Sequence, residues 1–184
     1  NLVELGAGNG EMMKVIINTF NKFPQFKNSC NIKILEKSKF LKKIQQKKIK
    51  SQKIKWLDDL EELNNLPCIF IANEFFDALP IKQFIKKKDK WYERNVKFSK
   101  LKNPEFIDIL TDIKKLKKKI GFDIAHKQKF IEYSPLLLKF LKKISKKINI
   151  LSGGILIIDY GYIVPQMKNT LQSISNHKFN HVLN

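Results

Sequence analysis

Residues 69–80 read IFIANEFFDALP, an apolar run that breaks into an Asn, two acids, two Phe and a Pro. An apolar run of this length, bounded by polar and turn residues, is typical of a buried parallel strand. In open α/β sheets, ligands bind at the carboxyl ends of the strands. Because Asn73, Glu74 and Asp77 follow the run directly, we expect them to line a functional site.

A second strand end lies at residues 2–10, which read LVELGAGNG. Gly6, Gly8 and Gly10 form a G-x-G-x-G pattern that permits a tight turn open to a nucleotide-like cofactor. Glu4 stands before the first glycine, where dinucleotide-binding turns normally keep an apolar residue. An acid there can meet an ammonium group, which favours the amino-acid part of S-adenosylmethionine over a pyrophosphate. A tight turn without any ligand is the alternative.

Strand and helix patterns alternate along the chain. The predicted strands are 2–5, 31–36, 54–57, 68–72 and 155–159, and the predicted helices are 11–23, 38–50 and 134–147. The second of these helices should turn Phe40, Leu41 and Ile44 inward. This alternation predicts an α/β fold, a doubly wound and mostly parallel sheet with the first strand at its centre.

The alternating pattern is interrupted after Pro80. Residues 82–87 and 91–98 read as two strands around a Lys-Lys-Asp-Lys turn, which predicts a β-hairpin inserted into the α/β order. The insert extends over about 82–129, with a further strand near 106–110 and then a Lys-rich helix or loop. We expect residues 1–184 to form a single domain that is truncated at both ends, because both termini interrupt a pattern.

The net charge of +19 is carried almost entirely by lysine, since Arg94 is the only arginine. Phosphate recognition more often uses arginine, whose planar fork binds phosphate through two hydrogen bonds. The lysines are scattered along the chain, so solvated lysine surfaces are the preferred interpretation. Nucleic acid is therefore not the expected partner, although an RNA acceptor stays open as an alternative.

Cys30 and Cys68 are too far apart for a Cys-x-x-Cys motif, which predicts two reduced thiols and a cytoplasmic protein. The three histidines have no ligand spacing with these cysteines, so no metal site is predicted. No apolar run approaches the ~18 residues of a membrane span.

Two further acids end predicted strands and extend the cofactor interpretation. Glu36 ends the second strand, where a carboxylate can accept hydrogen bonds from both hydroxyls of a ribose. Asp58 follows the third strand and could accept from an adenine amino group. A solvated acid in the cluster at 58–62 is the competing interpretation of Asp58.

The sequence Asn73-Glu74-Phe75-Phe76 lies where many amino-methylating enzymes keep Asn or Asp, then two prolines, then an aromatic residue. A carbonyl oxygen there orients the acceptor nitrogen, and an aromatic face favours a cation. Glu74 and Asp77 could instead clamp a guanidinium. A third interpretation places the Phe residues in the core and lets the acids cap a following helix.

Together these segments resemble the MidA family of S-adenosylmethionine-dependent methyltransferases. The matching segments are ELGAGNG (4–10), ILEKS (34–38), IANEFFDALPIKQF (71–84), WYERNV (91–96), EYSP (132–135), GGILIIDYGY (153–162) and TLQSISNHKFNHVL (170–183). The resemblance implies a class I, Rossmann-like methyltransferase fold that binds S-adenosylmethionine through Glu4, Gly6, Gly8, Gly10 and Glu36.

The resemblance also implies an acceptor site at Asn73, Glu74 and Asp77, with Asp159 and Tyr160 facing the same cleft. Mitochondrial members of the family methylate an arginine of a complex I core subunit, so a protein substrate and arginine methylation are expected. Two rivals stay open: an RNA methyltransferase, and a non-catalytic or decayed fragment that acts only as an assembly or binding module.

Overall fold

The computed structural model describes residues 1–50, 54–100, 102–163, 167–176 and 178–183. The chain divides into two compact units. Unit 1 consists of Asn1–Leu79 and Leu137–Gly161, and unit 2 consists of Pro80–Leu136 and Tyr162–Asn184. The predicted insert lies in unit 2, and the prediction of a single domain stays a prediction.

Unit 1 is built on a parallel sheet. In the described part of the chain this sheet has five strands, β1 (Leu2–Leu5), β2 (Ile32–Leu35), β3 (Lys55–Leu57), β4 (Cys68–Asn73) and β9 (Gly153–Ile158). Their order is β3-β2-β1-β4-β9, and every neighbouring pair is parallel. The first strand is therefore central, as the alternation of strands and helices predicts.

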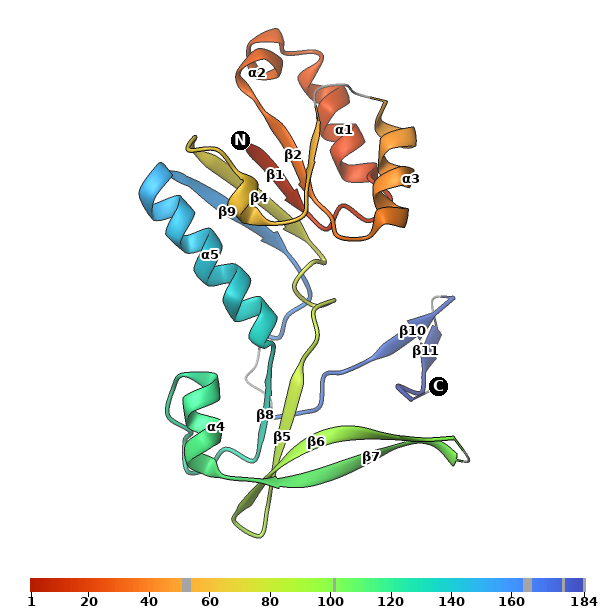
Figure 1. Cartoon of the computed structure of the whole chain (residues 1–184), viewed down its shortest axis with the longest axis vertical. Coiled ribbons are helices and arrows are strands. Elements are labelled where there is room, and N and C mark those ends of the chain that lie inside the picture. The colour runs from red at the N-terminus through yellow and green to blue at the C-terminus, as the bar shows by residue number, and fades with distance from the viewer. Residues whose placement is uncertain (51–53, 101, 164–166, 177, 184) are drawn as a thin grey trace. The chain divides into compact units, whose positions relative to one another are not determined.

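Helices cover both faces of this sheet. They are α1 (Glu11–Phe20), α2 (Pro24–Ser29), α3 (Lys39–Ile49), the 3₁₀ helix η1 (Leu60–Glu62) and α5 (Pro135–Leu151). Helices α1 and α3 lie on one side of the strands and α5 lies on the other (Figure 1). The doubly wound arrangement is thus confirmed.

Alternate residues of the strands supply the two cores of unit 1. Val3, Leu5 and Phe70 pack with Ile144 of α5 on one face. Ile34 packs with Met13 of α1 on the other face, where Ile49 of α3 also contributes. Because β1 is buried on both faces, its residues are apolar with the exception of Glu4.

Two local predictions in unit 1 are wrong. The predicted helix 11–23 ends at Phe20, and a separate helix, α2, begins at Pro24, whose missing N–H is harmless in a first helical turn. On α3, Phe40 is 72% exposed, whereas Gln45 and Ile49 are buried one turn apart. Because the polar residue Gln45 lies on the buried face of α3, the positions of the apolar residues alone assign that face wrongly.

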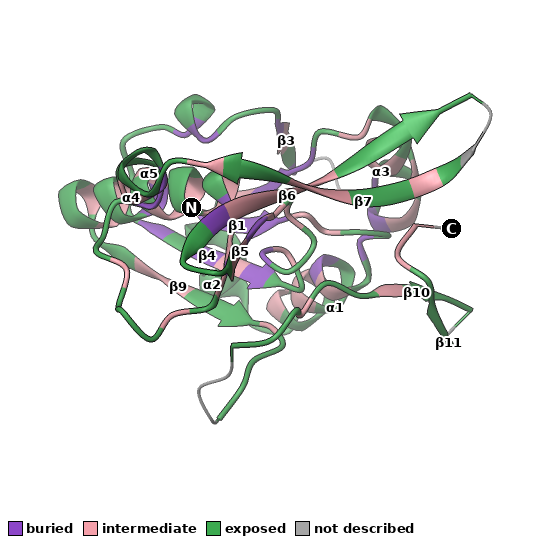
Figure 2. Ribbon diagram, turned by 90° about the horizontal axis from the view of Figure 1, so that it is seen from below, coloured by how far each residue is buried: buried purple, intermediate pink, exposed green. Residues whose placement is uncertain are grey.

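Unit 2 contains an antiparallel sheet in the order β7-β6-β5-β8, with α4 (Ile113–Ile120) against it. The strands are β5 (Lys82–Lys87), β6 (Lys90–Ser99), β7 (Lys102–Thr111) and β8 (Phe130–Tyr133), and a second pair is formed by β10 (Ser173–Ser175) and β11 (Lys178–Asn180). The predicted hairpin is confirmed as β5 and β6. The last residues of β6 are exposed (Figure 2), so the core of unit 2 lies around Phe84 and Trp91.

Among the described residues, no helix combines the length and the apolar character needed to cross a membrane.

Candidate active site

The glycine-rich turn after β1 has the backbone that the sequence pattern predicts. Gly6, Gly8 and Gly10 all have left-handed φ angles, +63°, +51° and +80°. Residues other than glycine rarely adopt this backbone conformation, so the G-x-G-x-G pattern reflects a requirement of the backbone. The Gly10 N–H donates to the Ala7 carbonyl at 2.7 Å, which closes the turn directly before α1.

The turn after β4 packs directly on this glycine-rich turn. A Cβ atom placed on Gly6 would lie 2.6 Å from Cδ2 of Phe75. The Phe75 ring also packs edge-on against Phe76 and against Phe140 of α5, with centroid separations of 5.3 and 5.2 Å. The structure thus brings the two predicted motifs together and places their aromatic residues in the core.

Glu4, in β1 two residues before Gly6, carries a buried carboxyl. It is 3% exposed, and its Oε2 is a buried atom that accepts no hydrogen bond from any described residue. Burial raises the pKa of this carboxyl to about 7. A buried acceptor without a donor is costly, so the position fits a ligand that brings a donor or a positive charge.

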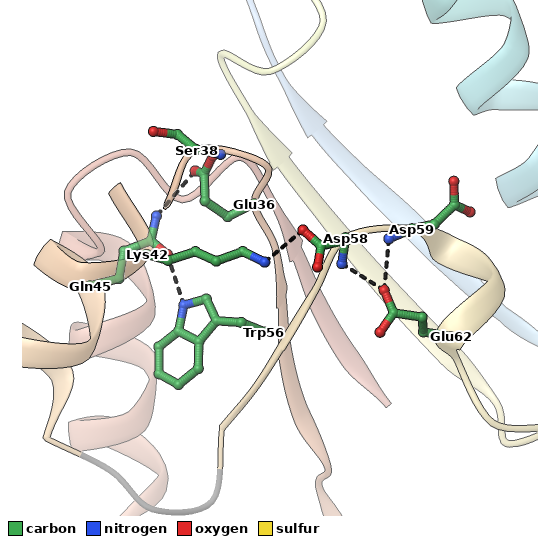
Figure 3. A network of polar contacts seen from close by, with 8 residues as sticks. All are labelled: Glu36, Ser38, Lys42, Gln45, Trp56, Asp58, Asp59 and Glu62. Atoms are coloured by element: carbon green, nitrogen blue, oxygen red, sulfur yellow. Dashed lines mark hydrogen bonds and ion pairs between the residues drawn. The ribbon is translucent and has the colours of Figure 1, made fainter. Parts of the chain in front are cut away.

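Glu36 follows β2 and is held by two N–H groups (Figure 3). Its Oε1 accepts from the backbone N–H of Ser38 at 2.8 Å, and its Oε2 accepts from Nε2 of Gln45 at 3.2 Å. A carboxylate has about four acceptor positions, so each oxygen can accept one more hydrogen bond. That capacity matches the two hydroxyls of a ribose, as the sequence predicts.

Gln45 and Trp56 belong to the same network and are missed by the sequence analysis. Gln45 is fully buried, donates from Nε2 to the Gly8 carbonyl at 2.8 Å, and accepts from Nε1 of Trp56 at 2.8 Å. The feature of the sequence that could have identified Gln45 is its position on the buried face of α3, one turn before Ile49. The buried face of α3 can be assigned correctly only when Phe40 is recognised as exposed.

Asp58 lies at the end of β3, in an ion pair with Lys42 of α3 at 2.8 Å (Figure 3). Its side chain is 78% exposed, and its backbone N–H donates to Oε1 of Glu62 at 2.6 Å. Glu62 and Asp59 form a reciprocal cap on η1. Asp58 therefore stands at the expected strand end as a solvated acid with a cationic partner, and its role toward adenine stays a prediction.

Asn73, Glu74 and Asp77 are exposed at the carboxyl end of β4. Glu74 has a left-handed φ of +47°, which is uncommon for a residue with a side chain and is often found at functional sites. The Glu74 N–H donates to the Ile158 carbonyl at 2.9 Å. The turn is thereby fixed to the end of β9.

Asp159 follows β9 and supports the same turn. Its Oδ2 accepts from the Asp77 N–H at 3.2 Å, and its Oδ1 accepts from the Tyr160 N–H at 2.8 Å. The element that follows Pro80 in the described chain is the strand β5, so the interpretation that the acids cap a following helix is wrong. Phe76 is buried, which agrees with its expected place in the core.

The predicted site residues thus lie in or directly after the ends of parallel strands that neighbour one another in the sheet, with Gly6 after β1, Glu36 after β2 and Asp77 after β4. Within the described residues, no three His, Cys, Asp or Glu side chains are grouped so that they could hold a metal ion. Cys30 and Cys68 are both free thiols.

Comparison with known proteins places this arrangement in context. Over 206 residues the chain is 26% identical to "Protein arginine methyltransferase NDUFAF7, mitochondrial" of Xenopus laevis, and the alignment covers 99% of this chain. It covers 47% of that protein, so the chain spans about half the length of this curated relative.

Two crystal structures of Burkholderia thailandensis proteins establish the fold. An uncharacterized protein has a TM-score of 0.75 at 20% identity and is matched over 97% of this chain and 50% of its own length. A second protein, crystallised with S-adenosyl-homocysteine bound, has a TM-score of 0.65 at 21% identity and is matched over 88% of this chain and 42% of its own length.

A family described as "Putative S-adenosyl-L-methionine-dependent methyltransferase" matches residues 1–184. This match confirms the resemblance to the MidA family and S-adenosylmethionine as the cofactor expected for it. The chain belongs to this family of S-adenosylmethionine-dependent methyltransferases.

Proposed function

We propose that the chain binds S-adenosylmethionine at the carboxyl ends of β1, β2 and β4 and methylates an arginine side chain of a protein. The observation that carries the proposal is Glu4, a buried carboxyl with an acceptor oxygen that no described residue satisfies. Its position in the strand that leads into a glycine-rich turn suits a ligand with an ammonium group close to a nucleoside.

In this proposal, different residues of the site bind different parts of the cofactor. Glu4 accepts from the ammonium group of the methionine part, directly or through water. The glycine-rich turn is open at Gly8, where the cofactor can come close to the backbone, and Glu36 accepts from the two ribose hydroxyls with its remaining lone pairs. Asp58 accepts from the adenine amino group with Oδ2, because Lys42 holds Oδ1.

When bound, S-adenosylmethionine supplies the methyl group of its sulfonium, and the carbon–sulfur bond that breaks leaves the thioether S-adenosylhomocysteine. A guanidinium stays protonated at physiological pH and must be held and charge-stabilised by its site. The exposed carboxylates of Glu74 and Asp77 can clamp it, and the Asn73 side-chain oxygen can orient the accepting nitrogen. That nitrogen gives up one proton as it gains the methyl group, and one of the two carboxylates accepts it.

The arginine target is supported by the names of relatives. Relatives from Xenopus laevis and Homo sapiens are called protein arginine methyltransferases at 26% and 24% identity. The resemblance to the MidA family adds a respiratory complex I subunit as the candidate protein. The free thiols Cys30 and Cys68 agree with a cytoplasmic location, which is part of this proposal.

The experiment is transfer of a labelled methyl group from S-adenosylmethionine to a complex I subunit, compared with the same subunit in which each arginine in turn is replaced by lysine. We expect labelling that depends on one arginine and is lost in Asp77→Asn. Asp89→Asn is the matched control, because Asp89 is an exposed acid in unit 2. Labelling that survives both Asp77→Asn and every arginine replacement would contradict the proposal.

A further inference from the structure

We propose that Gln45 is a positioning residue of the cofactor site, an inference that rests on the proposed function. Gln45 lies on α3, and its hydrogen bonds to described residues join it to the cofactor side of the site and not to Asn73, Glu74 or Asp77. It is fully buried and hydrogen-bonded to three groups from three different segments, the Gly8 carbonyl, the Glu36 carboxylate and the Trp56 indole. Figure 3 shows the contacts with Glu36 and Trp56.

The orientation of the Gln45 amide follows from its neighbours. The indole Nε1 of Trp56 can only donate a hydrogen bond, so the amide oxygen Oε1 must face Trp56. The amide nitrogen Nε2 then directs its two N–H groups toward the Gly8 carbonyl at 2.8 Å and Oε2 of Glu36 at 3.2 Å. Both partners are acceptors, so the reversed amide would place two acceptors against its oxygen.

This one amide therefore connects the glycine-rich turn to the proposed ribose acceptor. Its N–H groups hold the Gly8 carbonyl and the Glu36 carboxylate at a set separation before any cofactor binds. The stem of Gln45 also packs under Gly10, where an added Cβ would lie 3.3 Å from Cγ of Gln45. A site held in its binding geometry loses less entropy when the ligand arrives, which strengthens binding.

A purely structural role would look different in its consequences. If Gln45 only fastened α3 to the sheet, its removal would lower overall stability without a specific effect on the turn or on Glu36. A positioning role instead predicts loosening of residues 6–10 and an affinity loss that acts through Glu36.

Gln45→Met keeps the length of the side chain and removes all three hydrogen bonds. Trp56→Phe is a second variant that keeps the Gln45 amide and removes the indole donor that orients it, together with one ring of the Trp56 side chain. Gln46→Met, at the exposed neighbouring position on the same helix, is the matched control. Each variant is compared with the wild-type chain well below its melting temperature, so that folded protein is measured.

The first readout is backbone hydrogen exchange without cofactor. We expect residues 6–10 to exchange faster in Gln45→Met than in the wild type or in Gln46→Met. The second readout is calorimetric affinity for S-adenosylmethionine, which should fall about tenfold to a hundredfold in Gln45→Met and about threefold in Trp56→Phe. Unchanged exchange together with unchanged affinity in Gln45→Met overturns the role of Gln45.

A double-mutant cycle separates positioning from general damage. In a Glu36→Ala background, Gln45→Met should cost much less affinity than it does in the wild type, because the group that it positions is gone. Equal losses in both backgrounds would make Gln45 a structural residue only. If the wild-type chain itself binds no S-adenosylmethionine, the proposed function fails as well. Wild-type binding whose affinity, together with the exchange of residues 6–10, is unchanged in Gln45→Met overturns this inference alone.

Discussion

The ring of Phe75, in the turn after β4, lies so close to Gly6, in the turn after β1, that a Cβ on Gly6 would be 2.6 Å from its Cδ2. This contact joins the two sequence motifs on which the functional interpretation rests. Gly6 is thus required twice, once for its left-handed backbone and once for the space that Phe75 occupies. Gly8 shares the backbone requirement but has no heavy atom near its missing Cβ.

These two glycines give the first prediction. Gly8→Ala should destabilise unit 1 by about 1–2 kcal/mol, the cost of a left-handed alanine. Gly6→Ala should cost more, because backbone strain is joined by a clash with an aromatic ring that is packed on two sides. Urea unfolding of both variants checks the order.

Phe75→Leu provides the internal control for that comparison. In combination, Phe75→Leu should offset part of the stability loss caused by Gly6→Ala and none of that caused by Gly8→Ala. Of these two glycines, Gly6 contacts the Phe75 ring and Gly8 does not. Additive losses in the Gly6 pair would mean that the contact has no energetic consequence.

The second prediction concerns Glu4 and pH. Its pKa is about 7 in the folded chain and near 4.5 when unfolded, so between these values the folded state binds more protons. Below pH ~4.5 the Glu4 carboxyl is protonated in both states and does not lower the free energy of unfolding. Above pH ~7 it is ionised in both states, and its burial lowers the free energy of unfolding by up to about 3 kcal/mol. Stability is therefore lost as pH rises between these two values. Glu4→Gln should remove that loss, so its stability advantage over the wild type grows from pH 4.5 to 7 and is then constant.

Unfolding followed by the fluorescence of Trp56 in a Trp91→Phe background would report on unit 1, since Trp56 and Trp91 are the only tryptophans. A stability difference between wild type and Glu4→Gln that does not change with pH would contradict the assignment. If an ammonium group binds at Glu4, cofactor binding near pH 6 should also release a proton. That release is measured by calorimetry in buffers of different ionisation enthalpy.

The third prediction tests the ribose contact. Glu36→Ala removes a carboxylate whose two oxygens are each oriented by one N–H group. Hydrogen bonds to a charged group contribute roughly 1.5–3 kcal/mol, so affinity for S-adenosylmethionine should fall about tenfold to a hundredfold. Glu61→Ala, an exposed acid on η1, should leave it unchanged. Equal affinities in wild type and Glu36→Ala would remove Glu36 from the site.

The fourth prediction separates catalysis from binding. Asp159 accepts from the Asp77 N–H and so holds the turn that carries the proposed acceptor site. In Asp159→Ala this turn should loosen, and methyl transfer should fall by about tenfold to a hundredfold while cofactor affinity stays near that of the wild type. A parallel loss of both would show that Asp159 supports the whole fold of unit 1.

The sequence predicts the strands of unit 1 and the central place of the first strand, because the strands of a sheet covered on both faces read as apolar runs with turn residues at their ends. Glu4, Gly6 and Glu36 could be recognised because each breaks or ends such a run. Gln45 could not, since a buried amide looks like surface until its partners Gly8 and Trp56 are in place. The ion pair of Asp58 with Lys42 was hidden for the same reason, because it joins two different elements.

The most direct measurement is a calorimetric titration of the 184-residue chain with S-adenosylmethionine and with S-adenosylhomocysteine. We expect both to bind at one site, with both affinities reduced in Glu36→Ala and unchanged in Glu61→Ala. A folded chain that binds neither compound, or that binds them equally well without the Glu36 carboxylate, would contradict the cofactor site described for this protein.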